Sequence, residues 1–157
     1  MKNLLFVCAG NICRSPVVEF VVRSEFAAAG LDVAVASAGT GPWHVGKPAD
    51  ARTLASAAAH GYDLSAHRAR RVQPEDFANC DLLLAMDREN LQTLQAWCPR
   101  EYAARVALFL PFAGIATPPE VPDPYYGGRA DFERVIALAR AGADGLVRKL
   151  AAARAPR

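Results

Sequence analysis

The chain has 157 residues, of which 52% are hydrophobic and 22% charged, and its formal net charge is +2 at pH 7. This length suits one domain with its own core, and so small a net charge argues against nucleic acid or an anionic membrane as a partner. No apolar run approaches the about 20 residues that span a bilayer, and the N-terminal residues lack a signal-peptide cleavage site, so we expect a cytoplasmic protein without membrane insertion. The four cysteines and three histidines show no zinc spacing, and neither a metal nor a cofactor is expected.

Apolar runs of strand length alternate with segments of helical periodicity along the chain. Strands are predicted at residues 3–8, 33–38, 81–86 and 106–110. Helices are predicted at residues 16–29, 51–60, 74–78, 88–97 and 131–153. Short apolar strands that do not alternate with polar residues are typical of a parallel sheet covered on both faces. The pattern therefore predicts an α/β fold with one domain over residues 1–157, in which a parallel sheet lies between two helical layers.

Four residues are expected to define the ends of these helices. Aspartate is a favourable N-cap, and glycine adopts the left-handed conformation that ends many helices. The expected N-caps are Asp50 and Asp87, and the expected terminators are Gly30 and Gly61.

The segment after the first strand carries the strongest chemical signal. Cys8 ends the strand, and Ser15 and Pro16 suit the start of a helix, with Ser15 as its expected N-cap. Backbone N–H groups at a helix N-terminus favour an anion and the ionised form of a nearby thiol. Gly10 and Asn11 tolerate the backbone conformations that direct successive N–H groups at one oxyanion. This segment therefore predicts an anion-binding loop around a reactive thiolate.

An arginine completes the predicted loop. Five residues separate Cys8 from Arg14, whose planar guanidinium can bind two phosphoryl oxygens in a way that lysine cannot. Cys8 could then attack phosphorus in line. A buried structural cysteine beside an ordinary turn is the simpler alternative, but the whole loop favours phosphate chemistry. The phosphate-binding loop, hereafter the 8–15 loop, is expected to comprise Cys8, Ala9, Gly10, Asn11, Ile12, Cys13, Arg14 and Ser15.

This loop and several later segments resemble the low-molecular-weight protein tyrosine phosphatases. The resemblance covers nearly the whole chain in the family's order. It rests on residues 7–16, 37–40, 67–70 and 123–127, with Trp43, Asp76, Phe77, Met86, Asp87 and Asn90. It implies a four-stranded parallel sheet flanked by helices, with the phosphate-binding loop after the first strand.

The resemblance also assigns the catalytic roles. The family's loop cysteine forms a phosphocysteine and its loop arginine stabilises the transition state, roles that correspond to Cys8 and Arg14. The aspartate of the family's Asp-Pro-aromatic segment protonates the leaving phenolate and then activates water, and it corresponds to Asp123. A simple turn is the alternative for Asp123, since Asp-Pro is common in loops. Because Cys8 must be ionised and Asp123 protonated, a bell-shaped pH dependence is expected.

Further residues match supporting positions of the family. Ser15 corresponds to the serine that supports the thiolate. Residues expected to hold the loop are Asn11, Ser15, Ser37 and His67. Residues expected to line an aromatic cleft, deep enough for phosphotyrosine but not for the shorter phosphoserine, are Ala9, Trp43, Tyr125 and Tyr126. Cys13 corresponds to a redox partner of the nucleophile in several relatives, whereas Cys80 and Cys98 are expected to be structural.

Three rival functions share parts of this pattern. A thiol-dependent arsenate reductase needs further cysteines close together, but Cys80 and Cys98 are widely separated. A protein-arginine phosphatase carries threonine where this chain has Ile12. A phosphotyrosine-binding module would use the same loop without turnover.

The favoured function is hydrolysis of protein phosphotyrosine with release of inorganic phosphate. Bacterial relatives often oppose a tyrosine kinase that controls exopolysaccharide export, which makes such a kinase an expected partner. Other relatives act on host proteins after secretion, and both roles stay open at this point.

Overall fold

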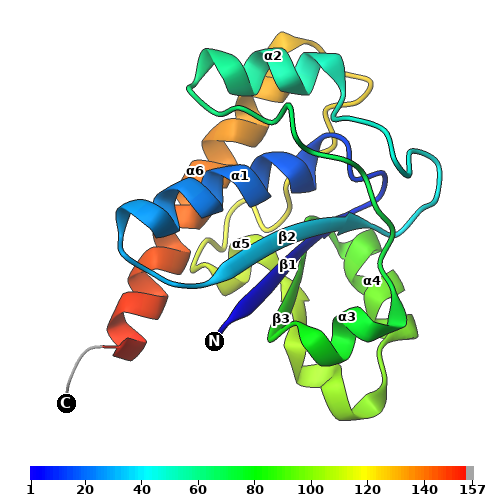
Figure 1. Ribbon diagram of the computed structural model, residues 1–157, viewed down its shortest axis with the longest axis vertical. Coiled ribbons are helices and arrows are strands. Elements are labelled where there is room, and N and C mark those ends of the chain that lie inside the picture. Colours follow the sequence, from blue (N-terminus) through cyan, green and yellow to red (C-terminus); the bar gives the residue numbers. More distant parts are fainter. Residues whose placement is uncertain (155–157) are drawn as a thin grey trace.

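A four-stranded parallel sheet forms the centre of the computed structural model, which describes residues 1–154 (Figure 1). The strands are β1 (Asn3–Cys8), β2 (Ala34–Gly39), β3 (Leu82–Ala85) and β4 (Val106–Leu108), in the spatial order β2-β1-β3-β4. The chain thus leaves β1 for β2 on one side and later returns to β3 on the other side. Ligands of open parallel sheets bind at the carboxyl ends of the strands, at such a switch point. Cys8 lies there, beside Gly39 of β2.

Helices cover both faces of the sheet. They are α1 (Arg14–Ala28), α2 (Ala51–Ala59), α3 (Pro74–Asn79), α4 (Arg88–Trp97), α5 (Phe109–Phe112) and α6 (Arg129–Arg154), with a 3-10 helix η1 (Arg100–Arg105). Figure 1 shows α1 and α6 on one side of the sheet and α3 and α4 on the other. In the described part of the chain no helix is both long and apolar enough to cross a membrane.

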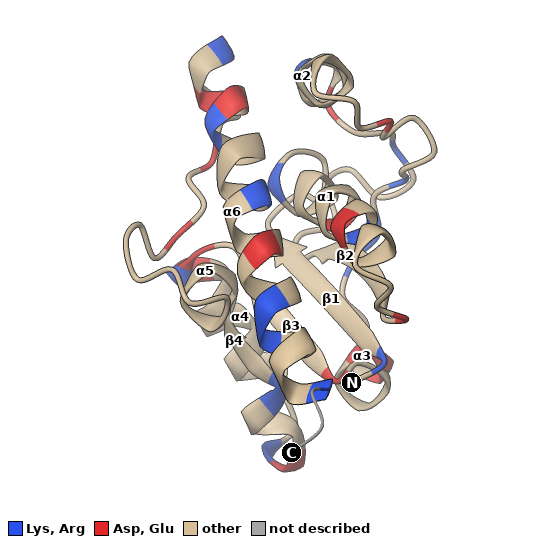
Figure 2. Cartoon of the chain, turned by 90° about the vertical axis from the view of Figure 1, so that its left-hand side faces the viewer, with Lys and Arg blue, Asp and Glu red and all other residues tan. Residues whose placement is uncertain are grey.

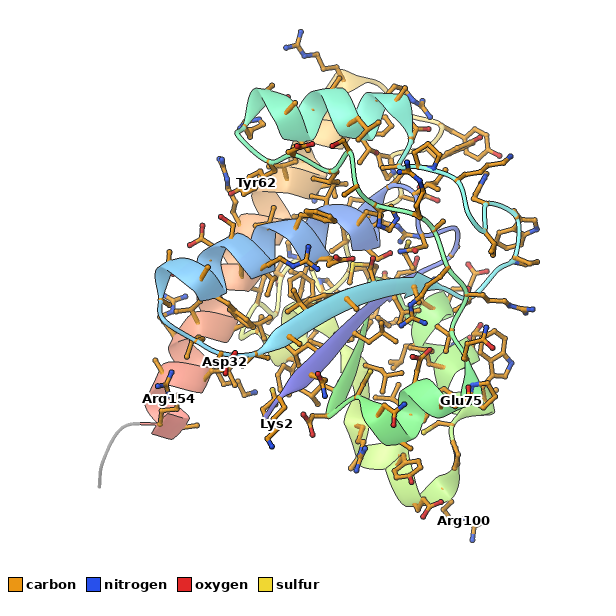
Figure 3. The ribbon with its side chains drawn as sticks, viewed as in Figure 1. Lys2, Asp32, Tyr62, Glu75, Arg100 and Arg154 are labelled. Carbon is orange, nitrogen blue, oxygen red and sulfur yellow. The ribbon has the colours of Figure 1, made fainter. Side chains whose placement is uncertain are left out.

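The core has two parts because alternate side chains of β1 point to opposite faces. Leu4, Phe6 and Cys8 belong to the buried cluster under α1 and α6, whereas Leu5 and Val7 belong to the cluster on the other face. The strands contain no charged residue, and Figure 2 shows Lys, Arg, Asp and Glu on the helices and loops. Side chains fill the space on both sides of the sheet (Figure 3). The predicted α/β fold with a covered parallel sheet is confirmed.

Four of the residues expected at helix ends are confirmed, namely Asp50, Asp87, Gly30 and Gly61. The Asp50 carboxylate accepts a hydrogen bond from the backbone N–H of Arg52 at 2.8 Å, and Asp87 caps α4 in the same way. Gly30 and Gly61 follow their helices with φ angles of 70° and 87°, the left-handed conformation that glycine adopts without strain.

Two predicted strands are too long. Residues 81–86 were expected to be extended, whereas β3 spans Leu82–Ala85. Residues 106–110 were expected to be extended, but β4 ends at Leu108 and α5 begins at Phe109. Pro111 explains the difference, because its fixed φ and missing N–H suit the first turn of a helix better than a strand. The 3-10 helix η1 was not predicted.

The tight packing of α6 against α5 generates a stability prediction. A Cβ atom on Gly145 would lie 2.0 Å from the backbone oxygen of Ala113, so we expect Gly145→Ala to lower the free energy of unfolding by about 1–3 kcal/mol through overpacking. The opposite exchange at the exposed helical Ala141, Ala141→Gly, should also lower it, by about 1 kcal/mol through helix propensity. Urea unfolding followed by circular dichroism measures both. If Gly145→Ala were more stable than the wild type, α6 would be able to move away from α5 at little cost in free energy.

Candidate active site

The 8–15 loop joins β1 to α1 at the end of the sheet to which the strand arrows point (Figure 1). Asn11 adopts a φ of 57°, a left-handed conformation that few residues other than glycine accept. Its backbone N–H donates a hydrogen bond to the Cys8 sulfur at 3.3 Å. The loop therefore directs a backbone donor at the thiol.

Ser15 lies inside the helix, and its expected role as the N-cap was wrong. The N-cap is Cys13, without a side-chain hydrogen bond, and α1 begins at Arg14. Pro16 is thus the third residue of the first turn, where its missing N–H costs no intrahelical bond. The Ser15 hydroxyl turns to the Cys8 sulfur, 2.9 Å away, instead of capping the helix.

The direction of the hydrogen bonds around Cys8 follows from Asn11. The Asn11 side-chain oxygen accepts from the backbone N–H of Arg70 at 3.0 Å, which fixes the orientation of the amide. Its Nδ2 then donates to Ser15 Oγ at 2.8 Å and to Ser37 Oγ at 2.9 Å. Because Ser15 Oγ accepts one of these bonds, its own hydrogen can point at the sulfur and donate to it.

Two residues outside the 8–15 loop hold this network in place. His67 is buried, and its Nε2 donates to the backbone oxygen of Asn11 at 2.8 Å. Ser37 donates to the buried Glu19 carboxylate at 2.6 Å. The structure thus places Ser37 and His67 behind the loop rather than in the cleft. Glu19 was not predicted, although a charge within the apolar run 17–22 of α1 was a usable signal.

Arg14 is fixed from one side by an ion pair. Its side chain is 4% exposed, and its Nη1 donates to Asp87 at 2.6 Å and to the backbone oxygen of Val121 at 3.0 Å. Burial alone would lower the pKa of Arg14, but the charge of Cys8 and the bond to Asp87 raise it above its usual value. The guanidinium therefore stays charged. Asp87 was expected only as a helix cap, because its second role depends on β3 lying beside β1.

Asp123 and the aromatic residues face the same cavity as Cys8. This cavity has a volume of about 290 Å³, and the 8–15 loop up to Arg14 lines it together with Trp43, His44, Asp123, Tyr125 and Tyr126. Asp123 is 52% exposed, and its Oδ2 lies 3.9 Å from Arg14 Nη2. Its Oδ1 accepts from the backbone N–H of Tyr125 at 3.0 Å. Tyr126 is 95% exposed and lies at the rim. The predicted cleft residues meet here, and His44 joins them although it was not predicted.

The remaining cysteines occupy separate environments. Cys13 is buried, and its burial raises the pKa of the thiol to about 12. Cys80 and Cys98 pack in or against the cluster on the sheet face opposite that of Cys8. The site therefore combines the Cys8 thiol, the fixed cation Arg14 and the exposed carboxylate of Asp123 around one cavity.

Comparison with known proteins identifies the family. The chain matches the family model for low molecular weight phosphotyrosine protein phosphatase over residues 3–155. It is 46% identical to the low molecular weight protein-tyrosine-phosphatase of Streptomyces coelicolor over 150 residues, which cover 92% of this chain and 91% of that protein.

Two solved structures share the architecture. The protein tyrosine phosphatase of Entamoeba histolytica, crystallised with Hepes in the active site, is 36% identical with a TM-score of 0.92, and the match covers 99% of this chain and 100% of that one. Vibrio vulnificus Wzb in complex with benzylphosphonate is 28% identical with a TM-score of 0.83, over 94% and 98% of the two chains. With this geometry and these matches, the chain belongs to the low molecular weight phosphotyrosine protein phosphatase family.

Proposed function

We propose that this protein hydrolyses phosphotyrosine in proteins through a phosphocysteine on Cys8. The observation that carries the proposal is the position of the Cys8 sulfur, 2.9 Å from Ser15 Oγ and 3.3 Å from the Asn11 N–H, in a cavity shared with Arg14 and Asp123. The thiolate attacks phosphorus, and an S–P bond forms as the P–O bond to the phenol breaks. The released electron pair goes to the phenolic oxygen, which takes a proton from Asp123.

The second step returns the enzyme to its starting state. Asp123, now ionised, removes a proton from water, whose oxygen attacks phosphorus as the S–P bond breaks. Inorganic phosphate leaves and the Cys8 thiolate is regenerated. Arg14 balances the charge of the phosphoryl oxygens in both steps, since Asp87 holds only its Nη1 side. The thiolate supplies the nucleophile and Arg14 the positive charge, so the proposed chemistry needs no metal.

The cavity favours an aromatic phosphate ester. Trp43 and Tyr125 line it with Ile12, and aromatic side chains add about 0.5–1.5 kcal/mol to the binding of a ring beyond its area burial. Phosphoserine is too short to place its phosphorus at a recessed thiolate. The relative crystallised with benzylphosphonate, a phenyl ring one carbon from phosphorus, is consistent with this preference.

The rival functions receive less support. An arsenate reductase would pass a disulfide to further cysteines, but Cys80 and Cys98 pack on the sheet face opposite that of Cys8. A binding module would not need the exposed Asp123 carboxylate beside Arg14.

As the physiological substrate we propose a bacterial tyrosine kinase that controls exopolysaccharide export. This proposal rests on the sequence resemblance alone. Its test is whether the Cys8→Ser variant captures the phosphorylated kinase.

A panel of matched peptides tests the proposed substrate class. We expect chelator-insensitive phosphate release from the phosphotyrosine peptide, with much slower release from the phosphoarginine and phosphoserine peptides. Cys8→Ser should lower kcat about 1,000-fold or more, on the scale seen when a nucleophile is removed, while still binding the phosphotyrosine peptide. Release mainly from phosphoarginine would contradict the aromatic preference, and binding without any turnover by the wild type would indicate a recognition module.

The role of Asp123 predicts a dependence on the leaving group. Asp123→Ala should slow phenyl phosphate hydrolysis about 100-fold or more, because its phenolate needs protonation. The loss on p-nitrophenyl phosphate should be much smaller, because nitrophenolate leaves without a proton. Asp144→Ala, on the exposed face of α6, is the matched control. The measurement is the steady-state kcat of each variant on both esters. An equal fall in kcat on the two esters would remove Asp123 from the acid role.

We also propose that Cys13 protects Cys8 from irreversible oxidation. Peroxide would oxidise the Cys8 thiolate to a sulfenic acid, which condenses with the Cys13 thiol to a disulfide and releases water. A dithiol reductant then restores both thiols. We expect reductant to recover activity after peroxide treatment in the wild type and in the control Cys98→Ser, but not in Cys13→Ser. Full recovery of Cys13→Ser would rule out this role.

A further inference from the structure

The start of α2 connects the two loops that carry the proposed catalytic groups. We propose that Arg52 is a positioning residue, which holds the segment 122–127 and its Asp123 over the 8–15 loop. This inference rests on the proposed function, because it concerns where the general acid stands. Neither the motif nor the periodicity of the sequence pointed to Arg52.

One end of the connection is fixed to the 8–15 loop. The backbone N–H of Asp50 donates to the backbone oxygen of Ile12 at 3.0 Å. The Asp50 carboxylate in turn accepts from Arg52 Nε and Nη2, both at 3.1 Å. The hydrogen bond from Arg52 lowers the pKa of Asp50, so the pair stays ionised down to acidic pH. The Arg52 guanidinium is therefore oriented by residues bonded to the 8–15 loop.

The other end is fixed to the segment 122–127. Arg52 Nη1 donates to the backbone oxygen of Tyr125 at 2.9 Å. The guanidinium also lies over the ring of Tyr125, 5.3 Å from its centroid, and over that of Phe132 at 4.7 Å. Tyr125 bonds Asp123 through its backbone N–H. The position of Asp123 thus depends on Tyr125, and that of Tyr125 on Arg52.

Few other polar contacts hold the segment 122–127. Within residues 1–154, the bond from Arg52 is the only hydrogen bond that joins the segment 122–127 to another part of the chain. Asp123 adds only the 3.9 Å ion-pair contact with Arg14. Behind the segment lies a cavity of about 370 Å³, between α2 and the start of α6, which Arg52, Gly127 and Phe132 help to line. Within the segment Pro124 is buried, beside Val135 and Ile136 of α6. Tyr125 and the residues up to Gly127 are exposed, at the place where α2 and α6 approach each other (Figure 1).

The test compares two leaving groups in Arg52→Gln. A general acid raises the rate of the chemical step roughly 10²–10⁴-fold, and a small displacement of that acid loses part of the rate enhancement. We expect kcat for phenyl phosphate to fall about tenfold and kcat for p-nitrophenyl phosphate less than about threefold. Arg52→Met, which keeps an unbranched apolar stem and removes the guanidinium, should behave in the same way. Arg129→Gln removes a neighbouring arginine from the same cavity and is the control, with no leaving-group effect expected.

Further readouts separate the possible outcomes. The rate at which iodoacetamide alkylates Cys8, and the unfolding temperature, should stay near wild type, since the 8–15 loop keeps its own hydrogen bonds. An equal loss on both esters, or none, in Arg52→Gln and Arg52→Met would overturn the inference. If Asp123→Ala itself shows no leaving-group dependence, the proposed acid role of Asp123 fails instead. If the wild type releases no phosphate from the phosphotyrosine peptide, the proposed function fails, and the three failures are thereby distinguished.

Discussion

Asn11 is held in a left-handed backbone conformation by hydrogen bonds from three separate parts of the chain, and the shape of the site depends on it. Such a conformation costs roughly 1–2 kcal/mol for most residues. Here the cost is offset because every polar group of the buried Asn11 side chain has a partner, in Ser15, Ser37 and Arg70. The His67 ring bonds its backbone oxygen. The end of β2 and the loop after α2 thus hold one residue between β1 and α1.

The charges of the site are arranged around a single buried cation. Arg14 contacts Asp87 directly and Asp123 at longer range, and the Cys8 sulfur lies at the start of the same loop. Fixed donors near a reacting group are worth more than mobile ones, because they need no reorganisation during the reaction. The ion pair with Asp87 therefore matters for geometry as well as for charge. Asp87 and Val121 bind Nη1, whereas Nη2 lies 3.9 Å from Asp123 Oδ2.

Sequence patterns predicted the features of the site that depend on residues close together in the chain. They did not predict contacts that depend on the order of the strands and helices in space. The strand, the turn around Asn11 and the cysteine–arginine spacing are all local, so the loop could be found in the sequence. Asp87 acts on Arg14 only because β3 pairs with β1, and Arg52 reaches Tyr125 only because α2 lies beside α6. Ser15 was expected both to cap α1 and to support the Cys8 sulfur. Only the contact with the sulfur is present, since helical propensity does not show where α1 begins.

The bonds that shape the 8–15 loop come from the chain itself, and this has a consequence for turnover. Because the loop has its shape before a ligand binds, little conformational entropy is lost when it binds a phosphoryl group. Orthophosphate, however, has the same oxyanion as the ester from which it is released. The rigidity that helps the substrate therefore also retains the product. For the proposed reaction we expect competitive product inhibition, so that dephosphorylation slows wherever free orthophosphate accumulates.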